Sequence, residues 1–246
     1  AGDTITLTVE SSEALKSLSV VGGDGPPTPL TAVGDTGREW TLSDTVDSDD
    51  SGELSFTLNY EDLAGNDGAS VSDTTNNSKI TFDTTAPTLS SVTLASSNEA
   101  TNRAKSGDTL TLAFTSSEAI PVPTVTLAGS TVTATDTSSG AKTSWQAVHP
   151  VDSSTPNGSA SFNISFADAA GNTGTAVTTT TNQSFVNVDT TTPTLTLVKL
   201  KSNNTDNTSL AKATETVTLE FNASEIIETP SVKINGIEST VSIGSS

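Results

Sequence analysis

The chain repeats itself at a long and steady interval, and this repetition limits the folds that it can adopt. The segment GDTITLTVESSEAL at 2–15 recurs as GDTLTLAFTSSEAI at 107–120 and, in looser form, as TETVTLEFNASEII at 214–227. Equivalent residues lie 105 to 107 positions apart. An interval of this length is too long for one coil of a solenoid and fits a small domain repeated in tandem.

Two further motifs keep the interval and mark the boundaries of the repeats. EDLAGN at 61–66 recurs as ADAAGN at 167–172, and FDTTAPTL at 82–89 recurs as VDTTTPTL at 188–195. The proline of each DTT-x-P segment fixes its own φ and favours an extended residue before it, so the link between repeats should be short and stiff. We therefore predict three repeats: 1–84 without its first strand, a complete 85–190, and the N-terminal half of a third in 191–246.

Alternating apolar and polar residues predict the local structure of the complete repeat. Short alternating runs bounded by Gly, Pro, Asn, Asp or Ser fall at 89–94, 109–115, 124–127, 131–135, 144–148, 160–166 and 184–188. No segment shows a sustained helical period. About seven short strands in about 100 residues are typical of an immunoglobulin-like sandwich. The predicted fold is all-β, with tandem immunoglobulin-like β-sandwich repeats at a period of about 106 residues.

The predicted core follows from the same alternation. The side chains expected to be buried in the complete repeat are Leu110, Leu112, Phe114, Val125, Leu127, Trp145, Phe162, Ile164 and Phe166.

Composition excludes several classes of function. With 29 acidic and 10 basic residues the chain has a net charge of −19, so we expect neither nucleic acid nor an anionic membrane as partner. The absence of cysteine excludes disulfides and thiolate metal sites. No apolar run is long enough to insert into a bilayer, and no signal peptide is visible. Because residue 1 falls inside a repeat, we expect the chain to be a segment of a longer array.

Catalysis has little support in the sequence. The single histidine, His149, lies at a predicted strand end, and no G-x-S-x-G or H-E-x-x-H motif is present. Trp40 and Trp145 are equivalent in the repeat, which favours a packing role over a platform for sugars. We therefore expect no catalytic residues and no enzyme activity.

The motifs SSEA(I/L), D-x-AGN and (F/V)DTT-x-PTL, at these spacings, resemble the bacterial immunoglobulin-like repeats of large surface proteins. These include the extender regions of giant RTX-type and biofilm adhesins. The resemblance covers essentially the whole chain. It implies non-catalytic spacers of secreted, cell-surface proteins, in which Ca²⁺ at or near the joints makes the array rigid.

The strand directions of a sandwich predict where such a cation would bind. The second and sixth strands both finish at the end where the preceding linker arrives, so Asp83, Glu118, Asp168 and Asn172 should converge there. Ca²⁺ takes six to eight hard oxygen ligands, and three carboxylates packed together without a cation repel one another. The alternative is turn chemistry, because Asp, Gly and Asn are also good turn residues. By the same mapping the candidate ligands are Glu13, Asp62 and Asn66 in the first repeat, and Asp189 and Glu225 in the third.

The leading hypothesis is a structural segment of a calcium-stiffened adhesin stalk or extracellular fibre. Its partners would be neighbouring repeats, or protomers that complete each other head-to-tail; its surface ligand is unknown. The alternatives are a module that binds glycans or a host protein, and an accessory region of a secreted enzyme.

Overall fold

A computed structural model describes residues 2–22, 28–47 and 50–243, and within them it contains strands and turns and no helix. The prediction of an all-β fold is therefore confirmed. No helix in the described ranges is long and apolar enough to cross a bilayer. The chain forms two compact units. The first comprises Ala1–Ala95, Leu110–His149 and Ser161–Phe185, and the second comprises Ser96–Thr109, Pro150–Ala160 and Val186–Ser246.

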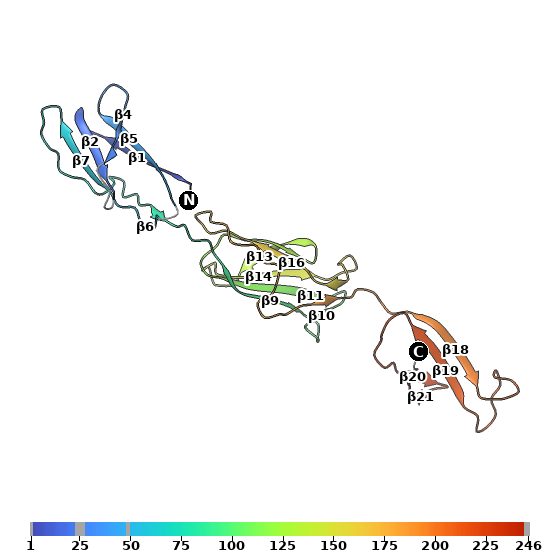
Figure 1. Cartoon of the computed structure of the whole chain (residues 1–246). Helices are drawn as coiled ribbons and strands as arrows, with labels where there is room; N and C mark the ends of the chain where they lie inside the picture. The colour runs from blue at the N-terminus through green and yellow to red at the C-terminus, as the bar shows by residue number, and fades with distance from the viewer. Residues whose placement is uncertain (1, 23–27, 48–49, 244–246) are drawn as a thin grey trace. The chain divides into compact units, whose positions relative to one another are not determined.

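In the first unit, residues 2–84 form two small sheets that face each other across an apolar core, with a short third sheet (Figure 1). One sheet has the order β1-β5-β4 and the other β3-β2-β7, while β6 pairs with β8. Leu7 and Val9 of β1 and Leu42 of β5 pack against a buried cluster that includes Leu18 of β2 and Leu58 of β7. The strand bounds are β1 Thr4–Glu10, β2 Leu15–Val21, β3 Thr28–Pro29, β4 Thr31–Val33, β5 Glu39–Thr45, β6 Gly52–Glu53, β7 Thr57–Asp62 and β8 Thr81–Phe82.

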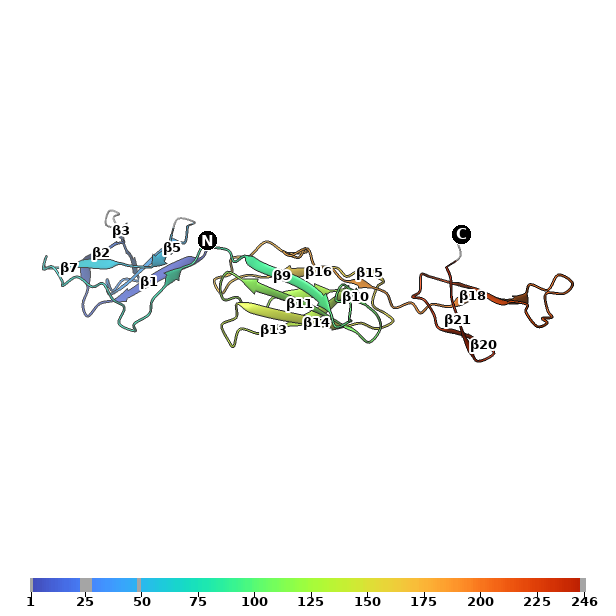
Figure 2. The same ribbon diagram turned by 90° about the horizontal axis from the view of Figure 1, so that it is seen from below.

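The remainder of the first unit is a larger sandwich built on one six-stranded sheet of order β16-β12-β13-β14-β11-β9. The first half of β13 pairs with β12 and its second half with β14, so this strand passes from one layer to the other. Figure 2 shows β9, β11, β13 and β14 side by side. The strand bounds are β9 Leu89–Ser96, β11 Thr109–Ser116, β12 Thr124–Leu127, β13 Ser130–Asp136, β14 Ser144–Pro150 and β16 Phe162–Ser165.

The core of this sandwich is the one expected from the alternation. All nine predicted core side chains are buried, from 0% exposed for Leu110 to 8% for Phe162. β11 has a strict alternation of buried and half-buried residues, as expected for a strand with one face on the core. The prediction of the core residues is confirmed.

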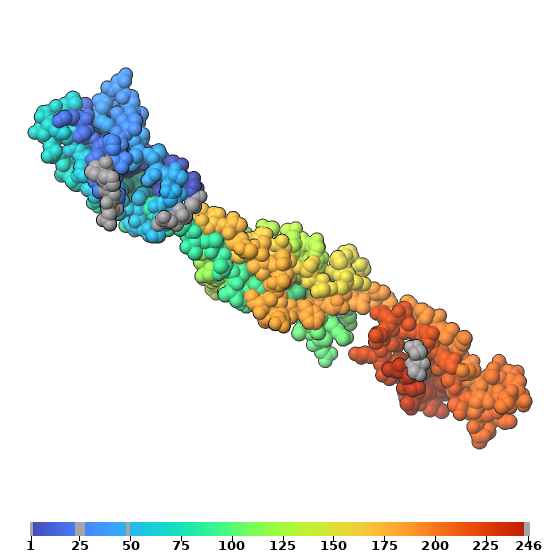
Figure 3. Space-filling view, in the orientation of Figure 1, coloured from blue at the N-terminus to red at the C-terminus, as the bar shows by residue number. Residues whose placement is uncertain are grey.

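The chain after β16 closes the open edges of this sandwich. Val177 forms a bridge with Ile164 of β16, and the Thr181 N–H donates to the Val92 carbonyl of β9 at 2.9 Å. The Ser184 hydroxyl accepts from the Leu94 N–H at 2.9 Å. This segment, yellow-orange in the space-filling view, runs along the visible face of the sandwich (Figure 3). Edge strands β9 and β16 are thus both covered.

The second unit contains three small sheets. β17 (Asn187–Val188) lies between β10 (Arg103–Ala104) and β15 (Gly158–Ser159); β18 (Leu195–Ser202) pairs with β19 (Val217–Ala223), and β20 (Val232–Ile234) pairs with β21 (Ile237–Ser239). Val198 and Leu200 of β18 are 58% and 65% exposed. Their repeat equivalents in β9, Val92 and Leu94, are buried.

The seven predicted strands of the complete repeat correspond to β9, β11, β12, β13, β14, β16 and β17, although β17 is shorter than predicted. The two-residue strands β10 and β15 were not predicted. All strand pairing among the described residues stays within 1–84, within 85–190 or within 191–246. The compact units cut across these limits, so the division into three repeats and its period stay predictions.

Candidate metal centre

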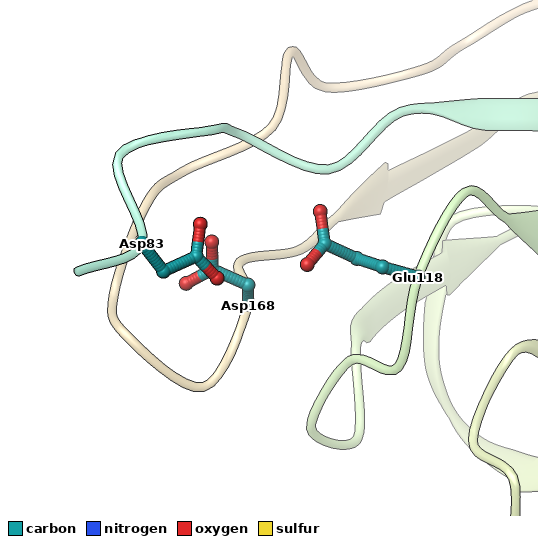
Figure 4. Close-up of side chains that lie close together, drawn as sticks. All are labelled: Asp83, Glu118 and Asp168. Carbon is teal, nitrogen blue, oxygen red and sulfur yellow. The ribbon is translucent and has the colours of Figure 1, made fainter. Parts of the chain in front are cut away.

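Three carboxylates from distant parts of the sequence meet in the first unit. Asp83 follows β8, Glu118 follows β11 and Asp168 follows β16. One carboxylate oxygen from each lies within 4.8 Å of the others. Asp83 and Asp168 lie beside each other, and Glu118 points toward them from the opposite side (Figure 4). Among the described residues this is the one group of three or more His, Cys, Asp or Glu side chains in such a position.

Asp168 is fixed by the tight turn that its own motif forms. The Asn172 N–H donates to Asp168 Oδ1 and Asn172 Nδ2 donates to Asp168 Oδ2, both at 2.8 Å. Gly171 takes a φ of +94°, which glycine adopts without strain. Asp168 is only 4% exposed. Burial opposes its ionisation, but hydrogen bonds from Asn172, Gly171 and Ala170 outweigh burial and hold the pKa of Asp168 below its usual value.

Asn172 also ties this turn to the segment that carries Asp83. Its Nδ2 donates to the Asp83 backbone carbonyl at 2.8 Å, in addition to the bond to Asp168. The Thr85 N–H donates to Asp83 Oδ1 at 3.1 Å, so the Asp83 side chain also makes the turn contact expected before Pro87. The side-chain nitrogen of Asn172 therefore links the two segments by hydrogen bonds. Its role as an oxygen ligand stays a prediction.

Glu118 is held by its backbone, while its carboxylate receives no hydrogen bond from any described residue. The Ser116 hydroxyl donates to the Glu118 carbonyl at 2.5 Å. Next to it, the Ser117 N–H donates to the Thr88 carbonyl at 2.8 Å, and the Ser117 hydroxyl accepts from the Thr88 N–H at 3.0 Å. Burial raises the pKa of Glu118, and the nearby charges of Asp83 and Asp168 raise it further. Ionisation of Glu118 in this site therefore costs free energy.

Close packing fixes the proline of this linker against the same turn. Pro87 is fully buried. A Cβ on Gly174 would lie 2.3 Å from a ring carbon of Phe166 and 2.7 Å from the Pro87 carbonyl oxygen. Only glycine permits this approach. The equivalent residues of the first repeat pack in the same way, since a Cβ on Gly68 would lie 1.9 Å from the Tyr60 ring.

The donor set suits a hard divalent cation. Carboxylate oxygens are the ligands that Ca²⁺ prefers, and three carboxylates offer up to six of the six to eight that it takes. The group contains no His or Cys, the residues that zinc favours. Two properties of the site fit a bound cation: the mutual repulsion of the carboxylates and the lack of a donor to Glu118.

The equivalent residues of the first repeat form the turn without the cluster. Asp62 Oδ1 accepts from the Asn66 N–H at 2.8 Å, and Asn66 Nδ2 donates to Asp62 Oδ2 at 2.7 Å, as in the Asp168 turn. The side-chain hydrogen bond from Asn66 lowers the pKa of Asp62. Glu13 is exposed and belongs to no group of three acidic side chains among the described residues. Turn chemistry accounts for these contacts, and a metal role for Glu13, Asp62 and Asn66 stays a prediction.

The third candidate pair lies in the second unit. Asp189 repeats the contact of Asp83, because the Thr191 N–H donates to Asp189 Oδ1 at 3.0 Å. The Oε1 atom of Glu225 is buried and has no hydrogen-bond partner in the described part of the chain. A buried oxygen without a partner costs stability unless a donor or a cation satisfies it. No described third carboxylate completes a group with this pair, so the prediction for them also remains open.

Comparisons with known proteins give weak similarities only. No protein-family model matches the chain, and no curated protein is similar enough to match. Among solved structures, the chain is similar to fibronectin(III)-like modules of Clostridium thermocellum CbhA, with 12% identity and a TM-score of 0.34 over 77% of this chain and 87% of that one. It is also similar to the Bacteroides ovatus mixed-linkage glucan utilization locus protein SGBP-B, solved with a mixed-linkage heptasaccharide, with 18% identity and a TM-score of 0.24. That match covers 82% of this chain and 46% of the other, so the chain spans less than half of SGBP-B. At these TM-scores neither similarity carries an argument for a shared fold or function.

Proposed function

We propose that the chain is a non-catalytic structural segment of an extracellular, cell-surface adhesin stalk or fibre, and that Ca²⁺ stiffens it at the linker containing Asp83. The observation that carries the proposal is the meeting of Asp83, Glu118 and Asp168 within 4.8 Å. The motif resemblance to bacterial adhesin repeats gives the cellular context. The excess of acidic residues suits a cation-binding protein.

The physical reasoning starts from the linker. Asp83 belongs to the segment after β8, whereas Glu118 and Asp168 follow strands of the next sandwich. A cation held by all three would join the linker to that sandwich through strong, short contacts. Domains joined by small polar interfaces move by default, so loss of the cation would restore that motion. Carboxylate sites of extracellular modules bind Ca²⁺ at roughly 10⁻⁴–10⁻³ M, a range that suits the outside of a cell.

The alternative of a glycan-binding module has less support. The second unit has a hollow of about 430 Å³ lined by polar and charged residues that include Arg103, Lys105 and Asp189, and by no aromatic residue. Small-molecule sites are mostly lined by apolar and aromatic side chains. The hollow therefore does not favour sugar binding over the structural role.

Calorimetric titration with Ca²⁺ tests the proposed site. The wild-type chain is expected to bind with a dissociation constant of roughly 10⁻⁴–10⁻³ M. Asp168→Asn and Glu118→Gln each remove one charged ligand while keeping the shape of the side chain, and each should weaken binding at least about tenfold. Glu99→Gln is the matched control, because Glu99 is exposed and outside the cluster. Equal binding by all four proteins would refute the assignment of these ligands.

A further inference from the structure

Asn172 joins two segments that lie far apart in the sequence. Its side-chain nitrogen donates one hydrogen bond to the backbone carbonyl of Asp83 and another to Oδ2 of Asp168, each at 2.8 Å. The first acceptor belongs to the linker after β8, and the second belongs to the turn after β16. An amide nitrogen carries two hydrogens, so these two bonds use its full capacity to donate.

The two side-chain bonds explain the residue type at position 172. The backbone closes the turn in another way, because the Asn172 N–H donates to Asp168 Oδ1 at 2.8 Å and the Asp168 N–H donates to the Asn172 carbonyl at 3.1 Å. Any residue with a backbone N–H can make these backbone contacts. Aspartate has the same shape as asparagine, but when ionised it only accepts hydrogen bonds. It therefore could not make either side-chain contact.

The linker is fixed to the same sandwich at a second point. The Thr88 N–H donates to the Ser117 hydroxyl at 3.0 Å, and the Ser117 N–H donates to the Thr88 carbonyl at 2.8 Å. Pro87 is fully buried between the two points, and its ring restricts the backbone. The linker is therefore held on either side of Pro87, through Asn172 before it and through Ser117 after it.

The bonds from Asn172 determine how Asp83 lies relative to Asp168. Figure 4 shows these two carboxylates beside each other, with Glu118 pointing toward them. One oxygen from each of the three lies within 4.8 Å of the others. Like charges at this distance repel, and Asp83 is exposed, so this repulsion favours movement of the linker away from the turn. The Asn172 nitrogen opposes that movement, because it bonds to both segments.

We propose that Asn172 is a positioning residue, which holds Asp83 beside Asp168 through its amide nitrogen and does not bind the cation. This inference rests on the proposed function, because the carboxylates that Asn172 holds are the proposed calcium ligands. Groups that orient metal ligands without touching the metal commonly change the affinity by about 10- to 100-fold when they are removed. The motif by itself is equally compatible with the opposite role, since an amide oxygen is also a calcium ligand.

Asn172→Asp separates the two roles by the sign of its effect on calcium binding. It keeps the shape of the side chain, removes both donated bonds and adds a carboxylate. If residue 172 bound through its oxygen, the added charge should tighten Ca²⁺ binding. A positioning role predicts the opposite, because a negative oxygen would lie against the Asp83 carbonyl and Asp168. Calorimetric titration should then show at least about tenfold weaker binding, and an affinity equal to or above that of the wild type would overturn the proposal.

Asn163→Asp is the matched control. Asn163 is exposed on β16 of the same sandwich, and its Oδ1 accepts from the Ser165 hydroxyl at 3.3 Å, a bond that aspartate can also accept. The variant adds the same charge outside the cluster, so its dissociation constant should stay within about twofold of that of the wild type. Each titration uses protein that circular dichroism shows to be folded. If Asn163→Asp weakened binding as much as Asn172→Asp, added charge alone would explain the effect and the proposal would be wrong.

Proton exchange of the Asn172 side chain tests the link without calcium and without a substitution. In wild-type protein in EDTA, nuclear magnetic resonance should show the Nδ2 protons of Asn172 exchanging with solvent at least about tenfold more slowly than those of Asn163. The exposed Asn163 side chain accepts a hydrogen bond and donates none to a described residue. Equal exchange rates would overturn the proposal even if Asn172→Asp failed to fold. A wild type that bound no Ca²⁺ would refute the proposed function, and the exchange rates would still decide whether Asn172 fixes Asp83 against the turn.

Discussion

Glu118→Gln should stabilise the chain without Ca²⁺ and should lose most of that advantage with Ca²⁺. In a chelator it removes an ionised carboxylate that lies within 4.8 Å of two others. Two unit charges at that separation repel by about 1 kcal/mol in a water-like dielectric and by about 3.5 kcal/mol at an effective dielectric constant of about 20. Asp83 is exposed, so the lower figure applies to that pair. We expect a net gain of about 1–2 kcal/mol in the free energy of unfolding without Ca²⁺.

With Ca²⁺ the same substitution should stabilise the chain much less. At about 10 mM Ca²⁺ and a dissociation constant of roughly 10⁻⁴–10⁻³ M, binding adds about 1.4–2.7 kcal/mol to the stability of the folded chain. Glu118→Gln removes one of three carboxylate ligands and should lose most of that gain. The advantage of the variant over the wild type is therefore expected to be smaller in calcium than in the chelator, by about 1 kcal/mol or more.

Urea titration followed by tryptophan fluorescence measures this difference in one sandwich. The chain has two tryptophans, so a Trp40→Phe background leaves Trp145, which is 3% exposed, as the reporter of the second repeat. Glu99→Gln serves as the control, with an expected change within about 0.5 kcal/mol in both conditions. A loss of stability that is the same with and without Ca²⁺ would refute the reasoning, because Glu118 would then act through structure alone.

Without Ca²⁺, the contribution of Glu118 to the free energy of unfolding should change with pH in a defined direction. The folded pKa of Glu118 lies above its ordinary value of 4.5, so the protonated form favours the fold. That contribution is fully present below 4.5 and is lost as the pH rises through the raised pKa. The advantage of Glu118→Gln should therefore be largest near neutral pH. It should shrink as the pH falls through the raised pKa toward 4.5.

Two further predictions concern packing. Gly174→Ala should destabilise the second repeat by about 1–3 kcal/mol or more, because its Cβ would overlap Phe166 and the Pro87 carbonyl; urea titration in the Trp40→Phe background measures it, and an unchanged midpoint would contradict the packing. Phe162→Ala should cost about 3–5 kcal/mol in the same assay because Phe162 is buried in the core, and a variant that unfolds with the wild type would show that the register of β16 is wrong.

The sequence predicted the strands of the second repeat well because alternation and turn residues report directly on a half-buried strand. It missed β10 and β15, since two residues are too short to alternate. The convergence of Asp83, Glu118 and Asp168 followed from strand direction alone. The orientation of the Asn172 side-chain amide could not be predicted in this way. The motif does not show whether the amide nitrogen or the amide oxygen of Asn172 faces the neighbouring segment.

Two other features depend on tertiary contacts that the pattern does not carry. Gly174 lies two residues after the end of the D-x-AGN motif. Only the Phe166 ring that packs against it shows why a side chain is excluded at this position. Likewise, only the folded structure shows that the Oε1 atom of Glu225 is buried without a hydrogen-bond partner. The recurrence of Glu at this position in all three repeats was the sequence signal for it.

Pulsed electron paramagnetic resonance across the Asp83 linker tests the central claim most directly. Because the chain lacks cysteine, Ser72→Cys and Ser130→Cys give one exposed label on each side of the linker. We predict a narrow distance distribution in millimolar Ca²⁺ and a broad one in EDTA, with Asp83→Ala broad in both. Distributions of equal width in Ca²⁺ and EDTA would show that the carboxylates are turn residues, and would contradict a calcium-stiffened stalk.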